Sequence, residues 1–357
     1  MKILTVVGNR PQFVKAAAVS HRLREIGEEV LVHTGQHHDA ELSRVFFDEL
    51  GLPRPDHLLA LGGGSNTEQT ARMLASLGPL VAAEAPDAVL VYGDTNSTLA
   101  GGLAAAQAGI PVAHVEAGMR SFDRTMPQEL NRVLTDHLSD LLLCSSEAPA
   151  ARLREEDVHG EIVVVGDVMV DVFALVAPRA RGRIVLEDLD PGEYVLVTAH
   201  RAGTVDDPAR LARLVDLLRG LPAPAVLPLH PRTRARLTDA GLLAALEDPA
   251  SGVRITPPLG LLDFTALLLG ARAVLTDSGG VQKEAYLAGV PCVTLRSTTE
   301  WTETVAAGWN VLVDLDPGAA RAALEREAPA LRPPLYGDGR AGERVVFALQ
   351  AHLGSVR

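Results

Sequence analysis

The sequence is short of the features that mark several classes of protein. Its 357 residues include only two cysteines, Cys144 and Cys292, which form no CxxC pair. A disulfide framework or a cysteine-ligated zinc site is therefore not expected. No apolar run approaches the length that spans a bilayer, and the opening "MKILTVVGNRP" has too short an apolar stretch for a signal peptide. We therefore expect a cytoplasmic protein.

Basic residues are also scarce. Lys and Arg number 33 against 45 Asp and Glu, which gives a formal net charge of −12. This balance argues against nucleic acid or a membrane surface as a partner, because either would require a basic stripe. It leaves room for an anionic small ligand, for which one basic pocket suffices. The sequence contains neither GxGxxG nor GxxxxGK[ST], so neither a dinucleotide-binding fingerprint nor a P-loop is inferred.

The sequence does contain a regular alternation of short apolar runs and amphipathic stretches. Helical patterns in the first half cover residues 11–26, 66–84 and 95–108. The strand candidates are "KILTVV", "VLVHT", "AVLVYG", "PVAHVE", "DLLLCS" and "EIVVVG", followed in the second half by "YVLVTA", "PAVLPLH", "GVRITP", "RAVLTDS" and "PCVTLR". Strands that are apolar on both faces and are separated by helices predict parallel sheets with right-handed crossovers.

The length of the chain favours two domains over one. We predict an α/β protein with two Rossmann-like, doubly wound domains, residues 1–166 and 167–357. The Arg-, Pro- and Gly-rich stretch 167–192 is expected to connect them, and a last helix over about 338–353 could pack on either domain. Ligands of such sheets bind at the carboxyl ends of the strands, so the strand ends are the places to look for a site.

Basic residues follow the first predicted strand, in "GNRPQFVK". Gly8 permits a tight turn, Pro11 suits the first turn of a helix, and the free N–H groups of that helix attract anions. Arg10 and Lys15 add positive charge nearby. A solvated basic pair at a helix start is the alternative interpretation.

Carboxylates follow two further strands, with Asp94 in "VYGDTNST" and Glu116 in "AHVEAGMRS". Either carboxylate alone could be a helix cap or a charged loop residue. Adjacent parallel strands end at the same edge of a sheet, however, so the two carboxylates are expected to lie close together. Next, "MPQELNRVLTDH" supplies Gln128, Glu129 and Arg132 at a helix start, where Glu129 and Arg132 could equally form a surface i,i+3 pair.

The second half places histidines and small residues at its strand ends. His200 ends the strand in "VTAHRAG", and His230 ends the one in "LPLHPRT". In "TDSGGVQKEA", the residues 278–280 open a helix whose bare N–H groups can seat a phosphate, and Glu284 could accept hydrogen bonds from ribose hydroxyls. The alternative interpretations are that Ser-Gly-Gly is only a helix cap and that His200 is a histidine of the core.

A group of histidines, His33, His37 and His38, raises the question of a metal site. No carboxylate stands near them at ligand spacing, so we expect no metal.

Taken together, the motifs "GNRPQFVK", "GDTNST", "HVEAGMRS", "PQELNR", "TAHR", "TDSGGVQKEA" and "YGDG" resemble those of the non-hydrolysing UDP-N-acetylglucosamine 2-epimerases over essentially the whole chain. The resemblance implies a glycosyltransferase-B-like architecture, with UDP in a central cleft between two Rossmann-like domains. It further implies a UDP-sugar substrate, a homodimer, and no metal or redox cofactor.

The resemblance also implies roles for individual residues. The residues implied to bind the nucleotide sugar are Arg10, Arg132, His230, Phe264, Ser278, Gly279, Gly280 and Glu284, and those implied to act in catalysis are Lys15, Asp94, Glu116, Gln128 and His200. The three residues 278–280 would hold the diphosphate, Glu284 the ribose and Phe264 the uracil. The family eliminates UDP across C1–C2 to 2-acetamidoglucal and adds it back, so Asp94 and Glu116 are the base and acid candidates. Lys15, Arg10 and His200 would stabilise charge.

Three positions depart from the family pattern. Gln128 stands where a catalytic glutamate is usual, Gly203 where glutamate is common, and Trp301 where many members have arginine. The leading function is reversible interconversion of UDP-GlcNAc and UDP-ManNAc. The alternatives are a 2-epimerase of a UDP-diacetamido-uronic acid, a hydrolysing enzyme that releases ManNAc, and a non-catalytic nucleotide-sugar binding protein. Retention of Asp94 and Glu116 favours the enzymes.

Overall fold

The structure, a computed structural model, describes residues 1–36 and 49–356, except for the side chains of Arg10 and Val356. The chain forms two compact units, which we call unit 1 (Met1–Leu175 with Tyr336–Arg357) and unit 2 (Val176–Leu335). For comparison, the sequence-based division fell between residues 166 and 167 and left the place of the last helix open.

Unit 1 contains a seven-stranded sheet in the order β3-β2-β1-β4-β5-β6-β7, in which all neighbours are parallel. Its strands are β1 (Lys2–Val7), β2 (Glu28–His33), β3 (His57–Leu58), β4 (Ala88–Tyr92), β5 (Val112–Val115), β6 (Leu141–Cys144) and β7 (Glu161–Val164). Its helices are α1 (Arg10–Ile26), α3 (Asn66–Glu84), α4 (Asn96–Gln107), α5 (Pro127–Leu138), α6 (Glu147–Glu155), α7 (Val168–Ala180), which runs into unit 2, and α16 (Ala341–Val356).

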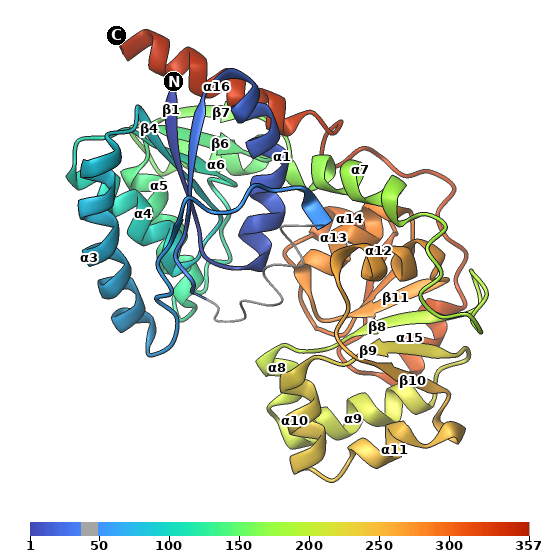
Figure 1. Cartoon of the computed structure of the whole chain (residues 1–357). Helices are drawn as coiled ribbons and strands as arrows, with labels where there is room; N and C mark the ends of the chain where they lie inside the picture. Colours follow the sequence, from blue (N-terminus) through green and yellow to red (C-terminus); the bar gives the residue numbers. More distant parts are fainter. Residues whose placement is uncertain (37–48, 357) are drawn as a thin grey trace. The chain divides into compact units, whose positions relative to one another are not determined.

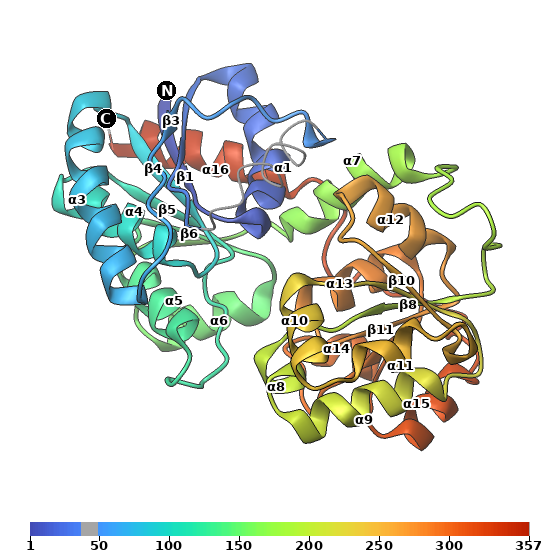
Figure 2. The ribbon, with the colours of Figure 1, turned by 60° about the horizontal axis from the view of Figure 1, so that its bottom comes forward.

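The sheet of unit 1 is buried on both faces because helices cover each of them. Figures 1 and 2 show α3, α4 and α5 on one face and α1 beside α16 on the other. The core between the sheet and α3 includes Leu4, Val6, Met73 and Leu77, all fully buried. Burial on both faces explains why these strands read as continuous apolar runs in the sequence.

The last helix, α16, belongs to unit 1. Its first backbone N–H groups, those of Ala341 and Gly342, donate to the Asp171 carboxylate of α7 at 3.0 and 2.9 Å. A Cβ on Gly342 would lie 2.2 Å from the Ala18 carbonyl oxygen of α1, so glycine allows the two helices to approach closely.

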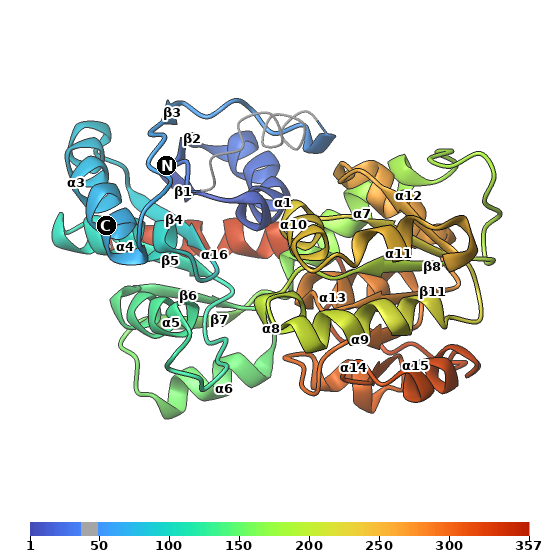
Figure 3. The same ribbon diagram turned by 90° about the horizontal axis from the view of Figure 1, so that it is seen from below.

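Unit 2 contains a six-stranded parallel sheet in the order β10-β9-β8-β11-β12-β13. Its strands are β8 (Val195–Thr198), β9 (Ala225–Pro228), β10 (Val253–Thr256), β11 (Ala273–Thr276), β12 (Cys292–Thr294) and β13 (Asn310–Leu312). Its helices are α8 (Ala202–Val205), α9 (Pro208–Arg219), α10 (Pro231–Asp239), α11 (Leu243–Glu247), α12 (Leu261–Gly270), α13 (Gly279–Ala288), α14 (Thr302–Ala306) and α15 (Pro317–Leu324). The helices α9 and α15 pack into one core cluster on the same face, and α12 lies across the sheet from them (Figure 3).

Both sheets follow the Rossmann strand order 3-2-1-4-5-6, with a seventh strand added in unit 1. The predicted α/β class with two doubly wound, Rossmann-like units is therefore confirmed. The chain direction across the sheet reverses between β1 and β4 in unit 1, and between β8 and β11 in unit 2. Loops diverge at these switch points, and ligands of open α/β sheets bind there.

Each of the eleven predicted strand segments contains a strand, while the short strands β3 and β13 were not predicted. The stretch 167–192 was predicted as a connection between domains, but in the structure α7 occupies its first half. The apolar run from Val168 to Ala177 sustains this helix, and Pro178 lies only near its end. Within the described part of the chain, no helix combines the length and the apolar character needed to cross a membrane.

Candidate functional site

Gln12 links the loops at the switch point of unit 1 through hydrogen bonds. It was not among the predicted site residues. Its side-chain oxygen accepts from the Gly8 backbone N–H at 2.7 Å, and its amide nitrogen donates to the Tyr92 carbonyl and the Thr98 hydroxyl at 2.8 Å each. Gln12 is 1% exposed, so these bonds are shielded from water. It thereby fixes the end of β1 relative to the loop that carries Asp94. The only signal in the sequence was its place inside "GNRPQFVK".

Lys15 points from α1 to the carboxylate of Glu116, which follows β5, and the two side chains form an ion pair with little exposure to solvent. Burial of the ammonium acts to lower the pKa of Lys15, but the charges of Glu116, Asp94 and Asp167 outweigh it and raise that pKa. Lys15 is therefore a permanent cation that interacts with both predicted carboxylates, Asp94 and Glu116.

Glu116 has an unfavourable backbone conformation. Its φ of +66° lies in the left-handed region, which a residue with a Cβ adopts at a cost of about 1 to 3 kcal/mol. The backbone N–H groups of Glu116 and Ala117 both donate to the Leu143 carbonyl, at 3.0 and 3.3 Å. Such conformations persist only where surrounding structure enforces them, and they cluster at active sites.

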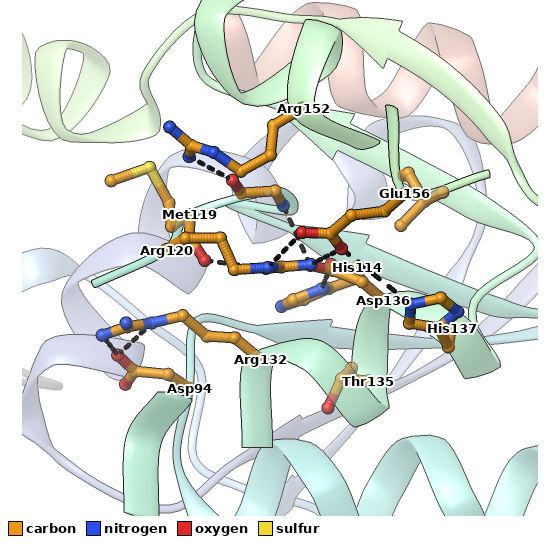
Figure 4. Close-up of polar contacts among 12 residues, drawn as sticks. Asp94, His114, Met119, Arg120, Arg132, Thr135, Asp136, His137, Arg152 and Glu156 are labelled. Carbon is orange, nitrogen blue, oxygen red and sulfur yellow. Dashed lines mark hydrogen bonds and ion pairs between the residues drawn. The ribbon is translucent and has the colours of Figure 1, made fainter. Parts of the chain in front are cut away.

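Asp94 forms a second ion pair, with Arg132 of α5. The guanidinium donates to Asp94 Oδ2 through Nη2 at 2.7 Å and Nε at 3.1 Å (Figure 4). Through Nη1, Arg132 also binds Glu129 at 2.7 Å. The side-chain amide of Asn131 donates to the Asp94 carbonyl at 3.0 Å, which holds the same loop from another direction.

Glu129 is not the plain surface residue that its spacing from Arg132 could have indicated, since it is only 2% exposed. Its carboxylate accepts from the backbone N–H groups of Ser121 and Phe122, at 2.8 and 2.9 Å. Gln128, its neighbour, is exposed at the second position of α5. The two side chains therefore point in different directions, as expected for adjacent helical residues.

In unit 2, a buried carboxylate organises the switch point. Asp277 is fully buried after β11 and accepts from the backbone N–H groups of His200 and Arg201, at 2.9 and 2.8 Å. The His200 ring lies 5.3 Å from that of His230, centroid to centroid, and His230 caps α10 by accepting from the Arg232 N–H. Asp277 thus joins the loops after β8 and β11. Asp277 was not among the predicted site residues, although it stands in "TDSGGVQKEA".

The predicted phosphate seat lies at the start of α13, where Ser278 is the N-cap and Gly279 and Gly280 are the first two residues. A Cβ on Gly279 would lie 3.5 Å from a guanidinium nitrogen of Arg201. The departure Trp301 lies at the same place, because its indole N–H donates to the Gly279 carbonyl at 2.8 Å. Lys283, on the same helix, lies 3.8 Å above the indole ring.

The remaining predicted residues lie on four different helices. Glu284 is half-buried on α13, and Phe264 is half-buried on α12, which packs beside α13. Arg10 is the first residue of α1. Gly203 is exposed in α8.

His33 is a buried residue of β2 whose Nδ1 accepts from the Gly35 N–H at 2.8 Å, and burial lowers its pKa to about 4. His37 and His38 lie outside the described residues. Across residues 1–36 and 49–356, no group of three or more His, Cys, Asp or Glu side chains could hold a metal ion. Cys144 and Cys292 are both free and buried.

Two Rossmann-like units with polar residues at both switch points define an α/β protein of the glycosyltransferase-B-like class. The family model described as UDP-N-acetylglucosamine 2-epimerase matches residues 21–350. The chain therefore belongs to the UDP-N-acetylglucosamine 2-epimerase family, which confirms the resemblance.

Individual relatives match the chain over almost its full length. The UDP-2,3-diacetamido-2,3-dideoxy-D-glucuronate 2-epimerase of Pseudomonas aeruginosa is 46% identical over 97% of this chain and 98% of its own. Among solved structures, the Methanocaldococcus jannaschii UDP-GlcNAc 2-epimerase in complex with UDP-GlcNAc and UDP is 38% identical, with a TM-score of 0.88 over 98% of this chain and 100% of its own. The Neisseria meningitidis UDP-GlcNAc 2-epimerase bound to UDP-GlcNAc is 29% identical, with a TM-score of 0.86 and the same coverage.

Proposed function

We propose that this protein catalyses the reversible 2-epimerisation of UDP-GlcNAc to UDP-ManNAc, by elimination and re-addition of UDP. The observation that carries the proposal is the shielded Lys15–Glu116 ion pair beside the Asp94–Arg132 pair, at neighbouring strand ends of the unit 1 sheet. Two carboxylates at a switch point, each held by a cation, suit proton transfer to and from a bound sugar.

The chemistry explains why two carboxylates are needed. The C2 proton of the sugar is not acidic, because no carbonyl adjoins it. In the proposed elimination, a carboxylate takes this proton, the C2–H electrons form a C1=C2 double bond, and the C1–O bond breaks with its electron pair leaving on the diphosphate. In the return step, UDP adds to C1 while a proton reaches C2 from the opposite face. The substrate is neither oxidised nor reduced overall.

The residues divide these tasks between them. Asp94 and Glu116 are the proposed base and acid, and Lys15, Arg10 and His200 stabilise the negative charge that develops on the departing diphosphate. In unit 2, the start of α13 holds the diphosphate, Glu284 the ribose and Phe264 the uracil. This division predicts that losses in unit 1 affect turnover more than UDP binding. The homodimer and the cytoplasmic location stay predictions.

A UDP-2,3-diacetamido uronic acid is a second candidate substrate. The 46% identity to the Pseudomonas aeruginosa enzyme favours it, against 38% to the Methanocaldococcus jannaschii UDP-GlcNAc 2-epimerase. The reaction at C1 and C2 is the same, so the proposed roles of Asp94 and Glu116 are unchanged.

NMR of the protein with each nucleotide sugar in deuterated water tests the proposal. We expect deuterium at C2 together with UDP-ManNAc from UDP-GlcNAc, and no exchange with Glu116→Gln, which is the matched control. Exchange into the diacetamido uronate alone would replace the proposed substrate with the second candidate. Release of free ManNAc would identify a hydrolysing enzyme, and saturable binding without exchange of either sugar would overturn catalysis altogether.

A further inference from the structure

Four charged side chains form a buried chain of ion pairs next to the candidate site in unit 1: His114, Asp136, Arg120 and Glu156 (Figure 4). His114 Nδ1 lies 2.7 Å from one oxygen of Asp136, and Arg120 Nη1 donates to the other oxygen at 2.6 Å. Arg120 then binds Glu156 through two nitrogens, at 2.6 and 2.9 Å. None of the four was predicted as a site residue.

The hydrogen bonds of His114 define its charge. Its Nε2 lies 2.7 Å from the Gly93 carbonyl oxygen, which can only accept, so Nε2 must carry a proton. Its Nδ1 faces Asp136, which also accepts from the Gly118 N–H at 3.1 Å and from Arg120. A neutral imidazole has one N–H, whereas here both ring nitrogens face acceptors.

The charge of Asp136 agrees with this reasoning. Asp136 Oδ2 accepts from Arg120 Nη1 at 2.6 Å and from the Gly118 N–H at 3.1 Å, and these two donors hold the buried carboxylate in its ionised form. The ionised carboxylate cannot donate, so His114 is the donor at both nitrogens. Two cations and two anions then balance. The balance matters most for His114, Asp136 and Arg120, whose side chains are buried, since an unpaired buried charge is very costly, whereas Glu156 is partly exposed.

The cluster contacts the backbone next to both predicted carboxylates. Gly93, bound by His114, directly precedes Asp94. His114 stands two residues before Glu116, and Gly118, bound by Asp136, stands two residues after it. The strained backbone of Glu116 is therefore fixed on both sides by one ion pair.

We propose that Asp136 holds His114 as a buried imidazolium, and that this ion pair makes Asp136 a positioning residue that aligns Asp94 and Glu116 for proton transfer. The positioning role rests on the function proposed above, whereas the charge of His114 does not. Other polar groups face the cluster as well: Arg152 donates to the Gly118 carbonyl at 2.8 Å, and His137 lies 3.9 Å from Glu156. Arg152 and His137 therefore contact Gly118 and Glu156, and their contacts do not involve the His114 ring.

NMR of the imidazole nitrogens in the wild-type protein tests the ion pair directly. After 15N-histidine labelling, with the His114 signals assigned through their loss in His114→Gln, we expect two N–H nitrogens at neutral pH. One protonated and one unprotonated nitrogen would overturn the imidazolium. This measurement decides the charge of His114, and the positioning role is tested separately.

Asp136→Asn tests the positioning role. We expect kcat for C2 deuterium exchange to fall about 100-fold, the loss that a misplacement of about 1 Å can cause, with KM and UDP affinity little changed. The matched control is Glu29→Gln, which also neutralises a buried carboxylate of unit 1. Glu29 lies in β2 and is bound by Thr5 of β1 and by Ser20 and Arg24 of α1. Circular dichroism establishes that both variants are folded at the assay temperature.

The outcomes separate this inference from the proposed function. Equal kcat values for folded Asp136→Asn and Glu29→Gln would overturn the positioning role while the epimerase proposal stood. A wild type that exchanges deuterium into neither nucleotide sugar would overturn both the epimerase and the positioning role, while the nitrogen signals of His114 would still decide the ion pair.

Discussion

The Lys15 ammonium contacts the Glu116 carboxylate across 101 positions of sequence. Lys15 lies one turn into α1, and Glu116 follows β5, two strands away from β1 in the sheet. The strand between them is β4, whose following residue Gly93 lies against the pair. The pair therefore joins α1 to the loop after β5, and it lies against the loop that carries Asp94.

Neutralising either carboxylate should stop proton transfer without loss of the nucleotide. Asp94→Asn and Glu116→Gln should each lower turnover at least about 100-fold, a typical general acid–base contribution. UDP affinity should change little, because the proposed nucleotide site lies in unit 2. Deuterium exchange at C2 and calorimetric titration with UDP measure the two quantities. Near-normal turnover in either variant would remove that residue from the acid–base pair.

Gly93 should be needed for activity beyond its effect on stability. Its φ is +64°, and an added Cβ would lie 3.4 Å from Lys15 Nζ and 3.5 Å from Glu116 Oε2. Gly93→Ala should therefore cost about 1 kcal/mol of backbone strain and also set an apolar methyl group in van der Waals contact with the ion pair. Gly109→Ala is the matched control, because Gly109 has a φ of +70° and no atoms near its Cβ position.

Urea unfolding and deuterium exchange, measured on both glycine variants, separate the two effects. We expect similar losses of unfolding free energy and a large loss of turnover for Gly93→Ala alone. A fully active Gly93→Ala would mean that the geometry of the Lys15–Glu116 pair does not limit the reaction.

Much of the fold could be predicted because buried parallel strands have a simple sequence pattern. Apolar runs such as that of β1 are continuous where helices cover both faces. The strand β3 has two residues, too few for such a pattern. The strand β13 lies at the edge of its sheet, begins with Asn310 and is only partly buried, so its sequence shows no apolar run. The helix α7 was hidden by the Arg, Pro and Gly that follow it, which dominate the composition of the stretch 167–192.

The candidate site was predictable only where residues end strands. Asp94 and Glu116 were found because parallel strand ends share one edge of a sheet. Asp136 and Glu129 lie on a helix whose sequence is polar over much of its length, and their carboxylates bind backbone N–H groups of the loop that precedes this helix. Asp277 was likewise hidden, since its partners are backbone N–H groups of another loop. Local spacing does not record such contacts.

The stability contributed by Glu129 should depend on pH in a defined direction. Burial acts to raise the pKa of Glu129, but hydrogen bonds from Ser121 and Phe122 and the charge of Arg132 outweigh it and lower that pKa. A carboxylate with a lowered folded-state pKa stabilises the fold above its unfolded-state pKa of about 4.5 and loses this contribution as the pH falls through the folded-state value.

Urea unfolding of wild type and Glu129→Gln across pH measures this contribution. The difference in unfolding free energy between the two proteins should be constant from pH 6 to pH 8 and should shrink below about pH 4.5. A difference that does not change with pH would show that the hydrogen-bonding shape of Glu129, and not its charge, stabilises the loop.

The exposed Gln128 provides a test of the substrate. It is the second residue of α5, where an added negative charge is tolerated by the helix dipole, so Gln128→Glu should leave the fold intact. If UDP-GlcNAc is the substrate, the new carboxylate restores the glutamate that the resemblance gives as usual at this position, and turnover should rise. If the substrate is a diacetamido uronate, the same change removes an amide donor and sets a carboxylate against a second anion, so turnover should fall.

Deuterium exchange of wild type and Gln128→Glu on both nucleotide sugars distinguishes these cases. We expect Gln128→Glu to raise turnover of UDP-GlcNAc. UDP-GlcNAc would be excluded as the substrate if the wild type exchanged deuterium only into the uronate and Gln128→Glu lowered that exchange.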